Sequence, residues 1–503
     1  ENLPQTVAIA GNVSTGGGDF ATNSAGNIEF SLVEATISTS SGNVQLTADG
    51  NVSLPGGGIF TTGGNLIING ASVQTVAGNS TVIDTTGGSG GDVTITATTD
   101  EIGLNASSIN SGGLIDLDAA TNINTGDLAA QNGQITLDST GDINSGGLTA
   151  NGSNITIGSE NLPQTVAIAG NVSTGGGDFN LTAAGDANFS LLSDTVNTGG
   201  GNFKPLQPAA IINLPAKQHS TTNGGIISIT GTSIGETDTG ITPALNSGAT
   251  TGGDIIITAT VGDITLNTSS LDASGVENSG NITIIATEGA IATNNLNATS
   301  QTGNGGTISL SAPAGIVTGI INSLTLAPDP VSQAGSVTLS SDGDISVLGI
   351  NAAANTGTGG DIIFGSNLLV IEPTSFVTTG TAGSGNIDLS AATINGSGTL
   401  SLTAGTGAVT LGDTGNVTPL GGLIVQGQSV TVTLINAQGN IDINASEFSA
   451  LQKLLPMLRA TMPAFPPPPV AAISPLTTMP HPSLSATPAT TVRQGRSQPA
   501  RKP

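Results

Sequence analysis

The candidate catalytic groups of this sequence are carboxylates that recur at the spacing of a repeat. Asp116 and Asp118 lie in the run Ile-Asp-Leu-Asp, and Asp138 ends a similar run one repeat after Asp118. Paired carboxylates act as general acid and base in glycosidases, whereas polysaccharide lyases combine carboxylates with Arg or Lys. Residues 1–450 contain two Lys and no Arg, which disfavours a lyase. We expect the three aspartates to be solvated, outward-facing positions rather than a paired acid and base.

Metal-binding and nucleophilic chemistry has few candidate residues. The sequence contains no Cys, and its two His, at 219 and 481, lie far apart. Calcium β-rolls need Gly-Gly-x-Gly-x-Asp nonapeptides, whereas Gly-Gly-Asp here leads directly into apolar alternation. We interpret this tripeptide as a turn in which Asp accepts hydrogen bonds from nearby backbone, so no metal or cofactor is expected. The tripeptide ends at Asp92, Asp178, Asp254 and Asp361.

A repeat of about twenty residues organises the stretch 121–160, where TNINTGDLAAQNGQITLDST aligns with GDINSGGLTANGSNITIGSE. Short alternating runs between Gly and Asn turns indicate stacked strands, and alternate residues of a strand share one face. The pattern predicts an all-β fold, a parallel β-helix, and the crossover rule favours the right-handed form. The predicted inward ladders are formed by Ile115, Leu117, Ile135, Leu137, Ile155 and Ile157.

Composition agrees with a β-solenoid. The 503 residues include 74 Gly, no Trp or Tyr, and only 8% charged residues. We expect a narrow interior with little room for aromatic rings. At about 4.8 Å per coil, roughly twenty coils would give a rod about 100 Å long.

Charge excludes several classes of partner. The formal net charge is −26, and residues 1–450 hold all 34 acidic residues. Such a body repels nucleic acid and anionic membrane surfaces. No apolar run approaches eighteen residues, so the sequence predicts no transmembrane helix.

An internal duplication marks the first half of the chain. The opening run, ENLPQTVAIAGNVSTGGGDF, recurs unchanged at 160–179, and weaker similarity extends the match to 1–44 and 160–203. Because the chain starts inside a repeat, we expect it to be a fragment of a larger protein whose export signal lies upstream.

Changes of composition divide the chain into segments. Residues 1–203 are repeats with a period near twenty, and 204–223, with three Pro and both Lys of the body, is expected to be an irregular loop. Residues 224–446 are repeats of longer period. Residues 447–462 could form a helix that caps the last coil. Residues 463–503 are Pro-rich and basic and are expected to be a disordered tail, either a genuine linker or a frameshift product.

Four runs resemble the repeats of filamentous-haemagglutinin-like exoproteins of bacteria: GGDVTITAT, GGDIIITAT, SGNITIIAT and GGTISLSA, which begin at residues 90, 252, 279 and 305. The resemblance covers residues 1–446. It implies two-partner secretion through an outer-membrane transporter, and a location outside the cell or on its surface. The Asn-Pro-Asn motifs of the family's secretion domain are missing, so export is implied for the parent protein.

Three functions are compatible with these features. The preferred interpretation is a non-enzymatic secreted or cell-surface adhesin or stalk, whose ligand would be an extracellular glycan or a cell-surface receptor. The alternative is a glycan-binding or glycan-active β-helix protein, which needs a carboxylate cluster in a cleft. The second alternative is an ice- or mineral-binding surface, which needs a flat Thr ladder and is hinted at by Thr94, Thr96 and Thr98.

Overall fold

The chain separates into two units, Glu1–Leu454 and Leu455–Pro503. The residues that the computed structural model describes all belong to the first unit. They are residues 3, 5–76, 79–88, 90–105, 107–189, 195–207, 211–214, 219–220, 224–236 and 244–450.

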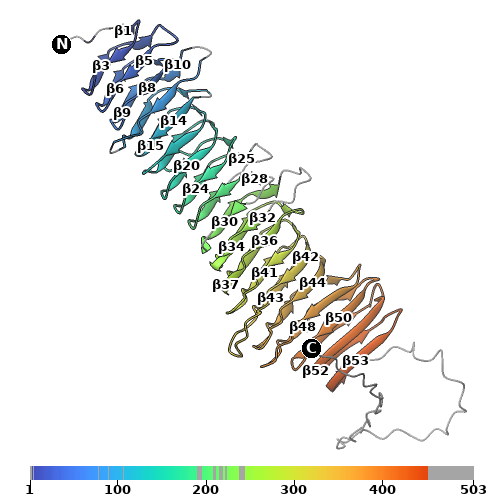
Figure 1. Cartoon of the computed structure of the whole chain (residues 1–503). Coiled ribbons are helices and arrows are strands. Elements are labelled where there is room, and N and C mark those ends of the chain that lie inside the picture. The colour runs from blue at the N-terminus through green and yellow to red at the C-terminus, as the bar shows by residue number, and fades with distance from the viewer. Residues whose placement is uncertain are drawn as a thin grey trace, which may run out of the picture. The chain divides into compact units, whose positions relative to one another are not determined.

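The first unit is a parallel β-solenoid, which confirms the predicted fold class (Figure 1). Strands β1 (Thr6–Ile9) to β53 (Ile441–Ala450) pass through about 17 turns, and 51 strands join one continuous sheet. The described residues contain no α-helix, and hence none that could cross a membrane. At about 4.8 Å per coil the stack is about 80 Å long.

Most coils have three strands, because a strand pairs with the strands three places before and after it. β18 (Ile135–Ser139) pairs with β15 (Ile115–Ala119) and β21 (Ile155–Ile157). We call the side formed by these strands face 1. The chain continues from β18 into β19 (Ile143–Ser145), which lies on face 2, and then into β20 (Leu148–Ala150), which lies on face 3. The three faces enclose the apolar interior.

The residue numbers of paired positions show that the coils differ in length. The predicted period holds for β15, β18 and β21, where Ile115 pairs with Ile135 and Ile135 with Ile155. Elsewhere the number of residues between paired positions is larger; for example, Leu66 pairs with Val93. The additional residues lie between the paired strands, so a coil lengthens without moving its inward positions. Longer coils explain why there are fewer turns than the roughly twenty expected.

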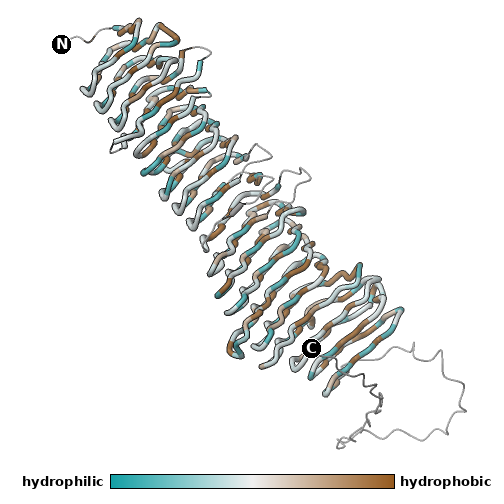
Figure 2. The backbone as a smooth tube through the Cα atoms, viewed as in Figure 1, coloured by the Kyte–Doolittle hydropathy of each residue, from teal (hydrophilic) through white to brown (hydrophobic). Residues whose placement is uncertain are grey.

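The core is built from ladders of equivalent side chains in successive coils. Ile115, Ile135 and Ile155 pair in register, as do Leu117, Leu137 and Ile157. All six side chains are fully buried. Hydrophobic and hydrophilic residues alternate along each coil (Figure 2), because successive side chains of a strand point to opposite sides.

Aromatic rings do fit inside this solenoid, contrary to the expectation from its narrow section. Phe179 and Phe203 occupy paired positions in adjacent coils, and their rings stack with centroids 5.6 Å apart and planes 14° apart. Phe364 and Phe376 stack at 5.3 Å. The first pair stacks between successive coils, whereas Phe364 of β45 (Ile362–Phe364) and Phe376 of β47 (Thr374–Val377) lie on two strands of one coil. Both pairs are stacked, an arrangement that aromatic pairs favour.

A column of glycines runs along the corner that precedes face 1. A Cβ atom added at Gly253 would lie 2.1 Å from the carbonyl oxygen of Gly225, one coil earlier. The same atom at Gly280 would lie 2.1 Å from the oxygen of Gly253, and at Gly306 it would lie 1.9 Å from that of Gly280. Only glycine permits such a close approach of backbones. This explains the glycine that opens most repeats; Ser153 occupies the equivalent position before Ile155.

Within 204–223, where an irregular loop was expected, the described residues 204–206, 211–214 and 219–220 form strands of the solenoid. β27 (Phe203–Leu206) and β28 (Ile211–Leu214) pair with strands of the coils before and after them. Pro205 occupies a buried position in register with Leu181. The fixed φ of proline suits an extended strand, and its missing N–H interrupts pairing only locally. The proline content of the segment therefore misled the sequence interpretation.

The C-terminal end of the described chain is a strand where a capping helix was expected. β53 pairs along its length with β52 (Gly422–Ile435), and Phe448 lies in this strand opposite Val430. The side chain of Phe448 is half exposed. Backbone pairing with β52 holds residues 447–450 in an extended strand, so no helix forms there. The rest of the expected helix 447–462 and the tail 463–503 lie outside the described residues.

Candidate functional site

Four carboxylates gather on the outer side of face 1. Asp116 and Asp118 lie on β15, Asp138 lies on β18 in register with Asp118, and Glu160 follows β21. Together they line a surface depression of about 330 Å³. The other lining residues are Leu114, Gln134, Thr136, Thr156 and Ser159.

Asp138 is buried, although it occupies an outward position on its strand. Only 5% of the residue is exposed, because the turn after β21 folds over it. Its carboxylate accepts hydrogen bonds from the Ser159 hydroxyl at 2.6 Å and from the Glu160 N–H at 2.9 Å. The expectation of a solvated aspartate is therefore wrong for Asp138. Ser159 and Glu160 were missed as partners, because a strictly regular repeat places no fold-back there.

Burial and mutual repulsion disfavour the ionised forms of Asp116 and Asp118 in this cluster. Burial raises the pKa of Asp116, and the neighbouring carboxylates Asp138, Asp118 and Glu160 raise it further. Burial also raises the pKa of Asp118, followed by the charges of Asp138 and Glu160. A carboxyl group whose pKa is raised by burial and by neighbouring carboxylates is one feature of a general acid.

The cluster lacks the other groups that β-helix enzymes use. The ion pair found among the described residues, between Lys204 and Asp178 at 3.5 Å, lies elsewhere on the surface. Within the described chain, no group of three or more His, Cys, Asp and Glu side chains is arranged to hold a metal ion. The cluster is a surface depression lined by carboxylate oxygens that can accept hydrogen bonds from hydroxyl groups.

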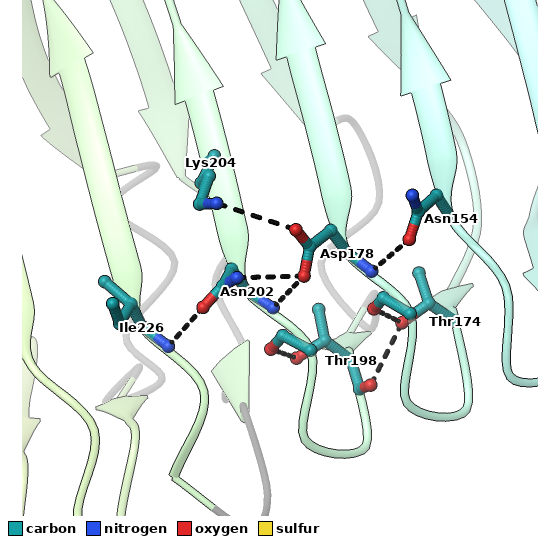
Figure 3. Close-up of polar contacts among 9 residues, drawn as sticks. Asn154, Thr174, Asp178, Thr198, Asn202, Lys204 and Ile226 are labelled. Carbon is teal, nitrogen blue, oxygen red and sulfur yellow. Dashed lines mark hydrogen bonds and ion pairs between the residues drawn. The ribbon is translucent and has the colours of Figure 1, made fainter.

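A second polar feature is a ladder of Asn and Asp side chains at the corner before face 1 (Figure 3). Asp178 donates its backbone N–H to Oδ1 of Asn154 at 2.8 Å. Oδ1 of Asp178 in turn accepts the backbone N–H of Asn202 at 2.8 Å. Asn202 repeats the contact with the N–H of Ile226 at 2.9 Å. Each side chain therefore satisfies a backbone donor of the following coil.

The ladder recurs along the solenoid and corrects the interpretation of Gly-Gly-Asp. Asp92, for example, accepts the N–H of Leu114 in the following coil rather than that of nearby backbone. Side chains at this corner accept hydrogen bonds from the next coil wherever Asn or Asp is present, because the strand start would otherwise leave an N–H unpaired. Further members are Asp19, Asn43, Asn65, Asp254, Asn281, Asp361 and Asn386.

Asp178 shows how the ladder holds a charge. Burial by itself would raise its pKa, but the N–H and the side-chain amide of Asn202 donate to it, and Lys204 lies beside it. These contacts favour the ionised form. The net effect is that the pKa of Asp178 is lowered below its ordinary value.

Buried threonines bond the same corner from the inside. The hydroxyl groups of Thr174 and Thr198 donate to the carbonyl oxygens of Gly177 and Gly201 respectively (Figure 3). The Thr174 hydroxyl also lies 3.0 Å from the carbonyl oxygen of Thr198 in the next coil. The corner is thus hydrogen-bonded on its inner and its outer side.

The remaining candidate residues are not brought together. The backbone of His219 pairs within the solenoid as part of β29 (His219–Ser220), and His481 lies outside the described residues. Thr94 is in register with Ile67 and Asp116, so the short Thr run does not continue into a ladder on the adjacent coils. This local geometry provides no Thr plane of the kind that ice binding needs.

Comparison with known proteins gives no assignment. No protein family, curated protein or solved structure matches the chain. The function is therefore inferred from the residues and the fold themselves.

Proposed function

We propose that this chain is a non-enzymatic adhesin or stalk that is secreted or displayed on the cell surface. The observation that carries the proposal is the continuity of pairing, in which 51 parallel strands form one sheet along the described chain. A solenoid of this kind is a spacer whose length is set by the number of coils.

Intercoil bonding supports a mechanical role. The backbone hydrogen bonds between coils, the Asn/Asp ladder and the apolar ladders all connect one coil to the next. A load along the axis is therefore shared by many bonds of each coil, and separating two coils requires breaking them together. The outward surface is acidic and carries many Thr, Ser and Asn side chains, whose polar groups suit water and sugar hydroxyl groups.

The proposed partners follow from the repeats and from charge. The resemblance of the repeats to filamentous-haemagglutinin-like exoproteins supports export of the parent protein by an outer-membrane two-partner-secretion transporter. An extracellular glycan or a cell-surface receptor is the proposed ligand. Nucleic acid is not a proposed partner, because residues 1–450 hold all 34 acidic residues against two Lys.

Surface display tests the proposal. The full chain is anchored through its C-terminus on a non-adherent bacterium, and a strain displaying the anchor alone is the control. We expect greater retention on polysaccharide-coated or cell-coated surfaces, or an N-terminal fluorophore held about 80 Å above the anchor by the coil stack. A strain that shows neither retention nor extension beyond the control would contradict both forms of the proposal.

A glycan-active role is the second candidate, and the carboxylate cluster around Asp116 favours it. We expect the purified chain to leave acidic and neutral polysaccharides uncut, with or without calcium, as judged by the release of reducing ends. Cleavage that is lost in Asp116→Asn but kept in Asp254→Asn, a ladder substitution, would favour the enzyme. Asp138→Asn is less informative, because Asp138 also holds the turn at Glu160.

A further inference from the structure

Five strands in the second half of the solenoid give face 1 a regular outer surface. They are β30 (Ile227–Gly231), β34 (Ile255–Ala259), β38 (Ile282–Ala286), β41 (Ile308–Ser311) and β43 (Val337–Ser340). Each pairs with the next in parallel, and they follow one another along the stack (Figure 1). No shift of register interrupts these pairings. Equivalent side chains of the five coils therefore stand in columns.

The first outward column contains hydroxyl groups and one β-branched apolar side chain. Its members pair in register from coil to coil and are Ser228, Ile256, Thr283, Ser309 and Thr338. All five are partly exposed, because the intervening residues of each strand carry the inward, buried side chains.

The second outward column lies two residues further along the same strands. Its members are Thr230, Thr258, Ile285, Ser311 and Ser340, again in register. All of them are partly or fully exposed. We call the two columns together the hydroxyl array, because eight of its ten positions are Ser or Thr and the other two are Ile.

Strand geometry fixes the spacing within the hydroxyl array. Equivalent residues of paired strands are about 4.8 Å apart, and residues two apart on one strand are about 6.6 Å apart. Across five coils the array extends for about 19 Å along the stack. Its hydroxyl groups therefore repeat in two directions at fixed distances.

The hydroxyl array is uncharged, although the molecule is strongly acidic. In the first column, Lys204 lies one coil before the array and Asp388 lies two coils after it. Between these two residues neither column holds a charged side chain. Earlier on face 1 the same two columns hold Asp116 and Asp118. The array is therefore a neutral section of a face that is charged elsewhere.

The hydroxyl groups of the array have no bonding role in the described structure. None of them forms a hydrogen bond with another described residue. By contrast, the inner hydroxyl groups of Ser247 and Ser323 donate to the carbonyl oxygens of Gly253 and Gly306. The outer hydroxyl groups are therefore free to bond water or a ligand.

We propose that the hydroxyl array is an ice-binding surface. Hydroxyl groups donate and accept hydrogen bonds, and the methyl groups of Thr and Ile restrict the water between them. The two spacings of the array are close to repeat distances of oxygen atoms in ice, so a bound layer of water can join the ice lattice. Charged side chains would orient water around themselves instead. The inference rests on the fold and is independent of the proposed function.

The surface of a crystalline polysaccharide is a less suitable occupant. Such a surface presents the apolar faces of sugar rings, which pack well on aromatic side chains. The hydroxyl array contains no aromatic residue on which a sugar ring could stack. Ordered water, which needs hydroxyl groups and small apolar groups only, is the occupant that the array fits.

Incorporation into slowly growing ice tests the proposal. The full chain carries a fluorophore at its N-terminus, serum albumin with the same fluorophore is the inert control, and the fraction of each protein in the ice is measured. We expect the chain to be enriched in the ice and albumin to be rejected. Thr283→Asp and Thr283→Lys place a charge of either sign in the middle of the first column, and both should lose the enrichment.

Matched substitutions elsewhere separate the array from the rest of the surface. Thr149 is a partly exposed outward residue of face 3, so Thr149→Asp and Thr149→Lys should keep the enrichment. Circular dichroism verifies the fold of each variant. Thr258→Lys, in the second column, should cause the same loss as Thr283→Lys and replaces it if that variant fails to fold.

Three outcomes would overturn the proposal. The first is rejection of the parent chain by ice to the same extent as albumin. The second is equal enrichment of the folded array variants and the Thr149 variants. The third is binding of the parent to suspended crystalline cellulose or chitin without enrichment in ice, which would assign the array to a polysaccharide surface.

Discussion

At the scale of single residues, the inward and outward positions of a strand have opposite requirements. Ile135 is fully buried between Ile115 and Ile155, and an ion there would lack both water and a partner. Thr149 lies on the outer side of face 3 and is partly exposed. A charged side chain is therefore tolerated at the outward positions of a strand and not at its inward positions.

Ile135→Asp should lower the free energy of unfolding by about 3–5 kcal/mol, because a buried unpaired carboxylate is costly and the apolar contacts are lost. Thr149→Asp is the matched control and should change it by less than about 0.5 kcal/mol. Urea denaturation followed by circular dichroism measures both. An unchanged midpoint for Ile135→Asp would mean that the register of β18 is wrong.

Asp116 and Asp178 should shift stability in opposite directions. The pKa of Asp116 is raised, so the stability linked to its protonation is complete below its ordinary pKa and is lost as pH rises through the raised value. The pKa of Asp178 is lowered, so its contribution is present above the ordinary pKa and is lost as pH falls. Ionised Asp116 therefore destabilises the fold at neutral pH, whereas ionised Asp178 stabilises it.

At pH 7 we expect Asp116→Asn to have a higher urea midpoint than the parent and Asp178→Asn a lower one. Both differences should shrink as pH falls: that of Asp116→Asn vanishes below the ordinary aspartate pKa, and that of Asp178→Asn vanishes only below the lowered pKa of Asp178. Shifts of the same sign at pH 7 would contradict the electrostatic account.

The hydrogen bond of Asp178 can be separated from its charge. In other coils Asn occupies the equivalent corner position and accepts the equivalent backbone N–H of the following coil. Asp178→Ala should cost about 1–3 kcal/mol by leaving the N–H of Asn202 unpaired, and Asp178→Asn should recover most of this loss. Hydrogen exchange at Asn202 gives an independent readout. Equal midpoints for the Ala and Asn variants would argue against the ladder.

At the scale of strands and turns, the close approach of backbones at one corner limits side-chain size. The duplication provides a matched pair of sites, because Gly177 and Gly18 have the same sequence on both sides. The neighbouring coil lies against Gly177, whereas an added Cβ atom at Gly18 meets nothing within 4 Å. The requirement for glycine therefore depends on the stack and not on the local sequence.

Gly177→Ala should be destabilising by about 1–3 kcal/mol, because the added methyl group pushes two coils apart. Gly18→Ala should be close to neutral in the same urea titration. A similar loss in both variants would mean that local backbone conformation, rather than stacking, requires glycine.

At the scale of the whole molecule, each coil contacts mainly the coils beside it. Ile115, Ile135 and Ile155 are equivalent positions in three successive coils. Removal of one such period preserves the equivalence of everything that follows, as in other repeat proteins.

Deletion of residues 135–154 should give a folded protein that is one coil, about 4.8 Å, shorter. Deletion of residues 135–144 should destabilise the stack, because it sets residues of one face against those of another. Circular dichroism and small-angle scattering distinguish the two outcomes. A whole-period deletion that aggregates as readily as the half-period one would show that the coils are not interchangeable.

The inward ladders and the parallel stacking were predictable from sequence alone. Side chains alternate along a strand, and Ile or Leu recurs at fixed columns, so Ile115, Ile135 and Ile155 could be placed on one inner face before any coordinates. The same columns identified the glycine that opens most repeats. The aligned residues of successive repeats do not reveal how long each turn is or which path its backbone follows.

Tertiary structure alone decided how the candidate site is assembled. Asp138 was predicted to be outward and solvated, but the turn after β21 folds back and buries it against Ser159 and Glu160. Residues 204–206 and 211–214 joined the stack despite Pro205, because strands of the coils before and after pair with them. In both places the conformation depends on hydrogen bonds to backbone groups of neighbouring coils, which cannot be identified from the local sequence. These hydrogen bonds outweigh the local conformational preference of the residues.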